Sequence, residues 1–224
     1  MNGFFNQKNW FYQAMGTLFD LVVLNVVTLI VSLPIFTAGA ALTSLHYVLW
    51  RTVRGEDGPL LRMYFQSFKE NFKQVTSVWL VMIVLAFIGG ADVYFDMHMQ
   101  KFIPSASRVM QLAFIALVAI VTVVAVAIVQ WYTILASRYT NTNRVHLKNA
   151  VLISLGYFPQ TLGMLILLMG TAIAAAAFYS YALIPMVILG VSLPQYLCAL
   201  IYTTVFKKLD GETGSDGETG RDKR

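Results

Sequence analysis

The chain has 224 residues, of which 58% are hydrophobic and only 12% are charged, and its formal net charge is +5 at pH 7. The charged fraction is about half that of an ordinary soluble domain, so the composition excludes a water-soluble protein. The only cysteine, Cys198, lies inside an apolar run, which excludes a disulfide framework and a thiolate metal cluster. The excess of basic residues is explained by membrane topology, so nucleic-acid binding has no support.

Five apolar runs are long enough to cross a bilayer core of roughly 30 Å, which takes about 20 helical residues. A sixth segment is marginal, because its 17 residues give roughly 26 Å of helix. The sequence therefore predicts an all-α, polytopic transmembrane bundle with five long spanning helices plus a short sixth. The predicted helices cover residues 13–33, 37–53 (the short sixth), 59–95 with its apolar part at 75–95, 109–137, 149–178 and 182–206.

The first predicted helix and the one at 109–137 each carry polar side chains on a single face. At 100° per residue, the polar residues of the first helix fall within an arc about 140° wide. An unpaired polar group that faces lipid is costly, so both faces are expected to turn toward protein or water. The candidate residues of a polar path between the two helices are Asp20, Asn25, Thr28, Gln130 and Thr133.

A structural interpretation of the same polar residues stays open beside the path. Asp20 lies one or two turns inside its helix, where it could bind a cation, relay a proton or contact a polar solute. In the structural interpretation it is hydrated at the interface or paired with Lys or Arg from a neighbouring loop. Asn25 and Gln130 are typical of side-chain amides that hydrogen-bond neighbouring helices within a membrane.

Pro34, Pro159 and Pro194 each follow a similar apolar stretch. Pro34 is expected to end the first helix and to start the short return at 37–53. If this return crosses, the chain crosses six times and its amino terminus is cytoplasmic; otherwise it crosses five times. Trp50 and Arg51 mark an interface at its end, which favours six crossings. Pro159 and Pro194 lie deeper inside their runs and are expected to kink helices rather than to end them.

The stretch RGEDGPLLRMYFQSFKENFKQ, residues 54–74, is the most structured of the predicted loops. Its apolar residues follow the i, i+4, i+7, i+11 spacing of an amphipathic helix, and the charged residues Arg62, Lys69, Glu70 and Lys73 are on the other side. Such a helix lies in the membrane interface, docks a partner, or simply leads into the next spanning helix. The candidate residues of a partner-docking loop are Arg54, Glu56, Asp57, Phe65, Phe68 and Phe72.

No residue pattern for catalysis, for a cofactor or for a metal ion occurs in the chain, and we expect a protein that is not an enzyme. The three histidines are far apart in sequence, and phosphate loops, nucleophile elbows and HExxH motifs are absent. Gly156, Gly163 and Gly170 recur at intervals of seven, which predicts a helix-packing seam rather than a reactive site.

Lys and Arg residues predict the orientation in the membrane. Thirteen of the sixteen fall in 51–73, in 138–148 and beyond 206, which lie on one side if each long run crosses once. Because cytoplasmic loops collect such residues, we expect a multi-pass protein of the cell membrane with a cytoplasmic carboxyl terminus. Residues 1–208 form the predicted transmembrane domain. The tail 209–224 repeats DGETG, has nothing to bury and is expected to be disordered.

Residues 20–80 resemble the amino-terminal half of the YesL family of bacterial integral membrane proteins. The shared features are Asn25, Ser32 to Pro34, Thr37 with Gly39, the region of Tyr47, Arg54 to Glu56, and the block from Phe68 to Gln74. The resemblance implies no biochemical activity and no catalytic residues. Members are often encoded beside carbohydrate-uptake systems of the ATP-binding-cassette type, which implies an accessory part in sugar import and transporter subunits as partners, with the lipid bilayer as surroundings.

Three hypotheses of function follow. The first is a non-enzymatic accessory or component of a carbohydrate-uptake system, with 54–74 as its docking surface. The second is a small secondary transporter or channel that uses the polar path. The third is a membrane scaffold or stress factor that carries no solute.

Overall fold

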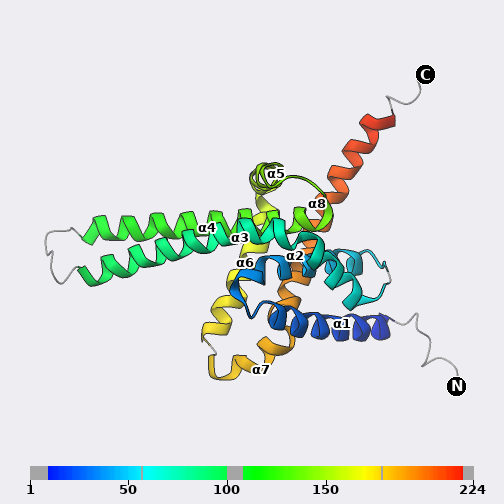
Figure 1. Cartoon of the computed structure of the whole chain (residues 1–224), viewed down its shortest axis with the longest axis horizontal. Coiled ribbons are helices and arrows are strands. Elements are labelled where there is room, and N and C mark those ends of the chain that lie inside the picture. The colour runs from blue at the N-terminus through cyan, green and yellow to red at the C-terminus, as the bar shows by residue number, and fades with distance from the viewer. Residues whose placement is uncertain (1–9, 57, 100–107, 178, 219–224) are drawn as a thin grey trace.

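The computed structural model describes residues 10–56, 58–99, 108–177 and 179–218, and this part of the chain contains helices and no strand (Figure 1). The elements in chain order are α1 (Trp10–Val31), the 3-10 turn η1 (Ile35–Thr37), α2 (Ala38–Val53), α3 (Leu60–Met99), α4 (Arg108–Arg138), α5 (Asn143–Gly156), α6 (Phe158–Ala177), α7 (Tyr179–Leu189) and α8 (Ser192–Glu218).

Four of the described helices are long and apolar enough to cross a membrane. Their candidate spans are Ala14–Val31, Leu60–Ala91, Leu112–Arg138 and Phe158–Ala177. The prediction of an all-helical chain with several helices of spanning length is therefore confirmed. The count of five long helices plus a short sixth is not confirmed, because the run 182–206 is divided between α7 and α8 and α2 is too short to qualify.

Helix α2, the marginal segment of the sequence, is the centre of the bundle. It packs against α1, α3, α4 and α8, and most of its residues are buried (Figure 1). Ala40, Ala41 and Ser44 are small enough to let neighbouring helices approach closely, which is how helices associate in lipid. The short helix α2 therefore lies in the core of the bundle and does not face lipid.

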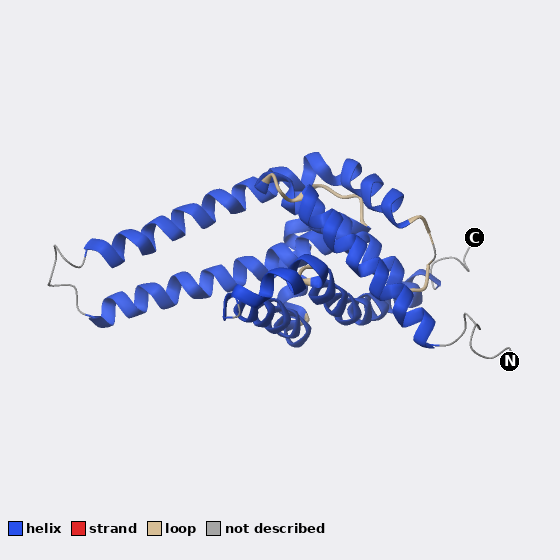
Figure 2. Cartoon of the chain, turned by 90° about the horizontal axis from the view of Figure 1, so that it is seen from below, coloured by secondary structure: helices blue, strands red, loops and turns tan. Residues whose placement is uncertain are grey.

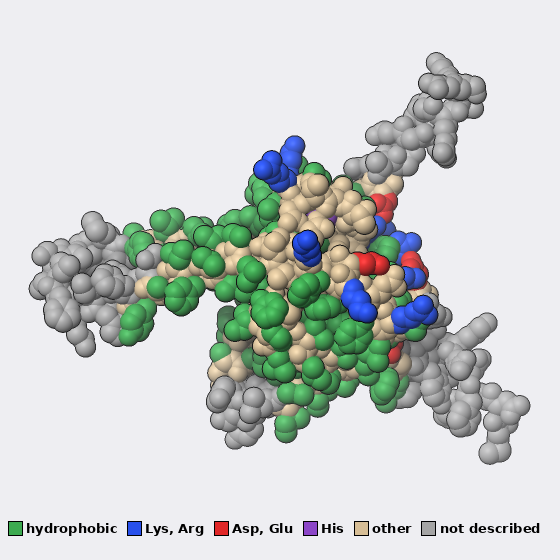
Figure 3. All heavy atoms as spheres, viewed as in Figure 1, with side chains coloured by type: hydrophobic (Ala, Val, Ile, Leu, Met, Phe, Trp, Pro, Cys, Tyr) green, Lys and Arg blue, Asp and Glu red, His purple; other side chains and the backbone are tan. Residues whose placement is uncertain are grey.

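Helices α3 and α4 form a long hairpin that extends beyond the rest of the bundle (Figures 1 and 2). Figure 3 shows apolar side chains covering the visible surface of this hairpin, whereas the coloured charged side chains gather on the body of the molecule. Phe87 on α3 and Ile120 on α4 are among its exposed apolar residues. A helix that is apolar all round is typical of a membrane span.

The prediction that Pro159 and Pro194 kink continuous helices is wrong. Each lies in the first turn of a new helix, α6 or α8, where the missing N–H of proline has no partner to lose. Figure 1 shows α5 almost end-on above α6, so the chain turns sharply between them. Pro34 does lie between helices, as expected, and Thr37 Oγ1 lies 2.6 Å from its carbonyl oxygen.

The predicted disorder from residue 209 onward begins too early. Helix α8 continues to Glu218, and its contacts explain why it passes the expected boundary. Leu209 packs against the buried core, and Asp210 forms an ion pair with Arg138 at 3.2 Å. Residues 219–224 lie outside the described part of the chain.

Candidate functional site

Asn25 of α1 joins the ends of two helices far along the chain. Its Nδ2 donates to the carbonyl oxygens of Met186 (3.0 Å) and Val187 (2.7 Å) at the end of α7. Its Oδ1 accepts from the N–H groups of Val191 (2.8 Å) and Ser192 (2.9 Å) at the start of α8. Helix ends leave such groups unpaired, so this buried amide satisfies both sides of the break with all four of its hydrogen bonds.

Two further candidate path residues, Gln130 and Thr133, bond to protein groups as well. Gln130 Nε2 donates to Gln195 Oε1 at 2.8 Å, which ties α4 to α8. Thr133 Oγ1 donates to the carbonyl oxygen of Gln130 at 2.9 Å, within α4. Thr28 is buried, and Asp20 is partly exposed near the outer side of α1.

The structure does not bring the two polar faces together as one path. In the described part of the chain α1 packs mainly against α7, α2 and α8, whereas α4 packs mainly against α5, α2 and α3. Asn25 therefore meets the α7–α8 break, while Gln130 meets Gln195 further along α8. Both amides act as interhelical hydrogen-bonding groups in this arrangement.

Charged residues from two separate parts of the sequence meet at one end of the bundle. Glu56 pairs with Arg51 (3.2 Å) and Arg54 (2.9 Å), which closes the turn after α2. The guanidinium groups of Arg54 and Arg138 both lie 4.6 Å from the Trp50 ring centre. This cluster, Arg51, Arg54, Glu56, Trp50 and Arg138, is called the charged end below. Asp57, also proposed as a docking residue, lies outside the described residues.

Arg138 is the centre of this end. Its side chain is only 8% exposed, because it lies 3.9 Å from the Phe206 ring centre and 5.2 Å from that of Tyr139. Stacking on aromatic rings and the ion pair with Asp210 together compensate the burial of its charge. Arg138 thereby connects α2, α4 and α8.

The amphipathic stretch after Pro59 forms the first turns of α3. Tyr64 and Ser67 face the bundle, and the Tyr64 hydroxyl donates to the carbonyl oxygen of Ala41 in α2 at 3.2 Å. The predicted apolar face of this stretch does not form this contact but lies next to it on α3. Leu61 is 46% exposed and Phe65 is 42% exposed.

The remaining two apolar residues of this stretch, Phe68 and Phe72, are half-buried. Their ring centres lie 5.3 Å apart. The four residues Leu61, Phe65, Phe68 and Phe72 are called the α3 stripe below. Its accessible surface is not used by the described part of the fold.

The three glycines predicted as a packing seam have different surroundings. A Cβ atom at Gly163 would lie 3.6 Å from Ile201 of α8, an ordinary contact. At Gly156 and Gly170 a Cβ atom would meet no described neighbour within 4 Å. Gly156 also ends α5, so the seven-residue spacing does not continue along one helix.

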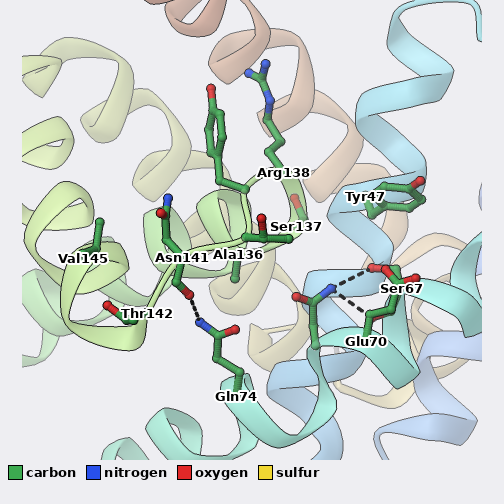
Figure 4. Close-up of a pocket in the computed structure, with 13 residues that line it drawn as sticks. Tyr47, Ser67, Glu70, Gln74, Ala136, Ser137, Arg138, Asn141, Thr142 and Val145 are labelled. Carbon is green, nitrogen blue, oxygen red and sulfur yellow. Dashed lines mark hydrogen bonds between the residues drawn. The ribbon is translucent and has the colours of Figure 1, made fainter.

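A cavity of about 500 Å³ lies beside the charged end, where α2, α3, α4 and the connection from α4 to α5 meet (Figure 4). Gln74 of α3 donates from Nε2 to the carbonyl oxygen of Asn141 at 2.6 Å, which holds one wall to the other. Asn71 donates from Nδ2 to the carbonyl oxygen of Ser67 at 3.0 Å and to its hydroxyl at 3.3 Å. Tyr47, Glu70 and Ser137 also line the cavity.

His146 lies in α5, close to this cavity but not in its lining. The ring is buried and meets Tyr132 edge-on at 5.9 Å between ring centres. Burial lowers the pKa of His146 below its usual value near 6.5, and a hydrogen bond to the Tyr139 backbone partly opposes this effect. The imidazole is therefore neutral at pH 7, and its role in the fold is packing.

Sequence reasoning missed the cavity, although part of its signal was present. Ser67, Glu70, Asn71 and Gln74 recur at i, i+3, i+4 and i+7, which places them on one side of α3. The polar stretch 139–143 that forms the opposite wall is distant in sequence. Only folding brings these two polar segments together.

Comparison with known proteins gives one match. A family model described as "Protein of unknown function, DUF624" matches residues 21–93. Searches of curated proteins and of solved structures found no match. The chain is thus similar to a family of unknown function over about a third of its length.

The matched region has a clear structural meaning. It runs from α1 through α2 into α3, and therefore covers Asn25, the η1 turn, the charged end up to Glu56 and the α3 stripe. It also covers the α3 wall of the cavity, including Glu70 and Gln74. The partners of Asn25 in α7 and α8, Arg138 of α4 beside Trp50, and the Asn141 wall of the cavity lie outside the match.

Proposed function

We propose that this protein is a non-enzymatic integral membrane protein of the YesL type that serves as an accessory or component of a carbohydrate-uptake system. In this proposal the 54–74 segment is the surface that meets subunits of an ATP-binding-cassette transporter at the cytoplasmic face. The observation that carries it is the α3 stripe, whose exposed Leu61 and Phe65 lie next to the charged end.

The chemistry of the stripe suits a protein partner. Apolar side chains bordered by charged residues are typical of interfaces, in which aromatic residues contribute most of the binding energy. Arg62, Lys69 and Lys73 are exposed on the same turns of α3 and add a basic rim. An acidic partner surface would complement this rim.

The interior of the bundle supports an accessory role over a solute path. The amide groups of Asn25 and Gln130 are occupied by backbone and side-chain partners within the chain. A path would need polar groups that are free to exchange between the protein and a solute. Asn25 and Gln130 are instead used to join helices.

In-cell crosslinking followed by co-purification tests the proposal. We expect the native protein to recover transporter subunits, and the double variant Leu61→Ser, Phe65→Ser to lose them and to slow growth on the transported sugar. Leu152→Ser with Leu155→Ser is the matched control, because both leucines are exposed on α5 and lie outside the stripe.

Four outcomes would contradict the proposal. Recovery of no transporter subunit with the native protein removes the partner, and equal recovery with the stripe variant removes the surface. A deletion phenotype that is independent of the carbon source would instead support a membrane scaffold. Flux through the purified protein in vesicles would support a transporter.

A further inference from the structure

The α3 wall of the cavity beside the charged end presents mainly hydrogen-bond acceptors to whatever enters it. The amide nitrogen of Asn71 is engaged with Ser67, and that of Gln74 is engaged with the Asn141 backbone. The hydroxyl of Ser137 donates to the carbonyl oxygen of Ile134 at 2.7 Å. The amide nitrogens of Asn71 and Gln74 and the hydroxyl hydrogen of Ser137 are therefore already used by the protein.

The oxygen atoms of the same groups remain available. An amide has two donors and two acceptor lone pairs on separate atoms, so engaging the nitrogen leaves the oxygen free. Asn71 Oδ1 and Gln74 Oε1 are such atoms. Glu70 adds a carboxylate one residue before Asn71, and only one of its oxygens accepts a bond, from Gln66 Nε2 at 3.0 Å.

The one basic residue in the cavity lining does not offer its charge to a ligand. Arg138 directs its guanidinium group to Phe206 and Trp50 and pairs it with Asp210. Figure 4 shows its side chain running away from Gln74 and Asn141. An anion in the cavity would meet the Glu70 carboxylate and find no free cation in the described lining.

We propose that this cavity binds a small solute that carries a protonated amine. An ammonium group has three N–H donors and no acceptor, which matches a wall that offers a carboxylate and two amide oxygens. The volume of about 500 Å³ lies within the usual range for small-molecule sites and leaves room for a body of several heavy atoms. The proposal is independent of the docking function of the α3 stripe.

The site lies between α3 and the α4–α5 connection, which are distant in sequence. The bond from Gln74 to Asn141 and that from Asn143 Nδ2 to Ser77 Oγ (3.0 Å) connect α3 with the α4–α5 connection at the cavity edge. A solute that bonds to Glu70 while touching residues 139–142 would add to this connection. We therefore expect binding to stabilise the fold, because a ligand bound only by the native state raises its stability.

Thermal unfolding of the full-length protein in a neutral detergent tests the proposal with matched probes. Putrescine and glucosamine carry amines, and 1,4-butanediol and glucose are their neutral counterparts; glycolate is the anionic probe. We expect the two amines to raise the unfolding temperature in a saturable manner at constant ionic strength. The neutral and anionic probes are expected to leave it unchanged.

The variant Glu70→Gln keeps the shape of the site and removes its charge. Because Glu70 is exposed, the variant is expected to fold, and its apparent affinity for the amines should fall about tenfold, as the loss of a charge-assisted bond predicts. Asp92→Asn, which removes a carboxylate near the other end of α3, is the control and should bind as the native protein does.

Several results would overturn the amine site. They are no saturable stabilisation by either amine, equal stabilisation by the neutral counterparts, and unchanged amine affinity in Glu70→Gln. A decrease of the same size in Asp92→Asn would show a general charge effect and would also overturn it. None of these results bears on recovery of transporter subunits through the α3 stripe.

Discussion

At the scale of single residues, Asn25 has the largest structural consequence. Its amide satisfies two carbonyl groups of α7 and two N–H groups of α8. A buried backbone group left without a partner costs about 1–3 kcal/mol. Removing the amide exposes several such groups at once in a region where water is scarce.

We predict that Asn25→Ala lowers the free energy of unfolding by about 2–4 kcal/mol, since more than one backbone group loses its partner. Thermal unfolding in detergent measures this change. Asn25→Asp keeps the acceptor for Val191 and Ser192, but its second oxygen faces the α7 carbonyl oxygens and donates only when the carboxyl group is protonated, so it is expected to be less stable than the native protein. Val26→Ala, on the exposed side of α1, is the control. An effect of Asn25→Ala no larger than this control would contradict the role.

The sequence predicted that Asn25 forms an interhelical hydrogen bond, but it did not identify the partner atoms. A polar amide within an apolar helix predicts an interhelical hydrogen bond. Its partners lie more than 160 residues away and are backbone atoms, whose identity no side-chain pattern reveals. Gln130 and Gln195 are a similar pair separated by 65 positions.

At the scale of elements, the turn between α1 and α2 is held by a helix that follows it. Trp79 of α3 donates from Nε1 to the carbonyl oxygen of Ile35 in η1 at 2.9 Å. A Cβ atom at Gly39 would lie 2.8 Å from Cβ and Cγ of the same tryptophan. The Cβ of Trp79 is fixed to the α3 backbone, so only a shift of the helices would relieve the clash.

Gly39→Ala is therefore expected to destabilise the protein by about 1–3 kcal/mol, as overpacked cores do. Gly16→Ala is the matched control in α1, where a Cβ atom meets no described neighbour within 4 Å. The control should be neutral or slightly stabilising, because alanine favours a helix more than glycine does. Equal unfolding temperatures for the two variants would show that the Gly39–Trp79 contact is not restrictive.

The sequence predicted where the helices lie more accurately than it predicted where each helix begins and ends. Apolar length predicted α1, α3 and α4 closely. The runs 149–178 and 182–206 each concealed a break, because hydropathy measures only whether a segment is apolar, not whether it is continuous. At Gly190 a Cβ atom would lie 2.6 Å from the Met186 backbone, so glycine is required at this break.

The cavity was harder to foresee for a related reason. The polar residues of its α3 wall recur at helical spacing, but the apolar residues on the neighbouring face alone led to the prediction of an amphipathic helix. A polar face has meaning as a site only when the opposing wall is known. Residues 139–142 supply that wall through tertiary contacts.

At the scale of the whole molecule, the fold gathers the basic segments at one end. Arg51 lies in the last turn of α2 and Arg54 follows it, Arg138 ends α4, and Asp210 of α8 pairs with Arg138. The sequence argument for orientation assumed that these segments share a side of the membrane. The contacts through Trp50 and Phe206 place them next to one another.

Cysteine labelling tests the orientation, and native Cys198 is buried, so it does not react before unfolding. We predict that Lys69→Cys, Thr140→Cys and Lys208→Cys, all exposed positions, react with an impermeant maleimide only from the cytoplasmic side. Arg108→Cys should react only from the opposite side. Helix α4 has 31 residues and is about 46 Å long, which exceeds the bilayer core of about 30 Å.

The same experiment decides between five and six crossings at the α1–α2 turn. Leu33, Ile35 and Phe36 are exposed there, and each is apolar. With six crossings, Phe36→Cys lies at the outer surface and should react from outside, together with Arg108→Cys. A re-entrant turn within the bilayer would leave it unreactive from both sides until the protein is unfolded. We expect reaction from outside, because α2 ends at the charged end and its 16 residues span about 24 Å from there. Reaction of Phe36→Cys from the cytoplasmic side would contradict both arrangements and the orientation itself.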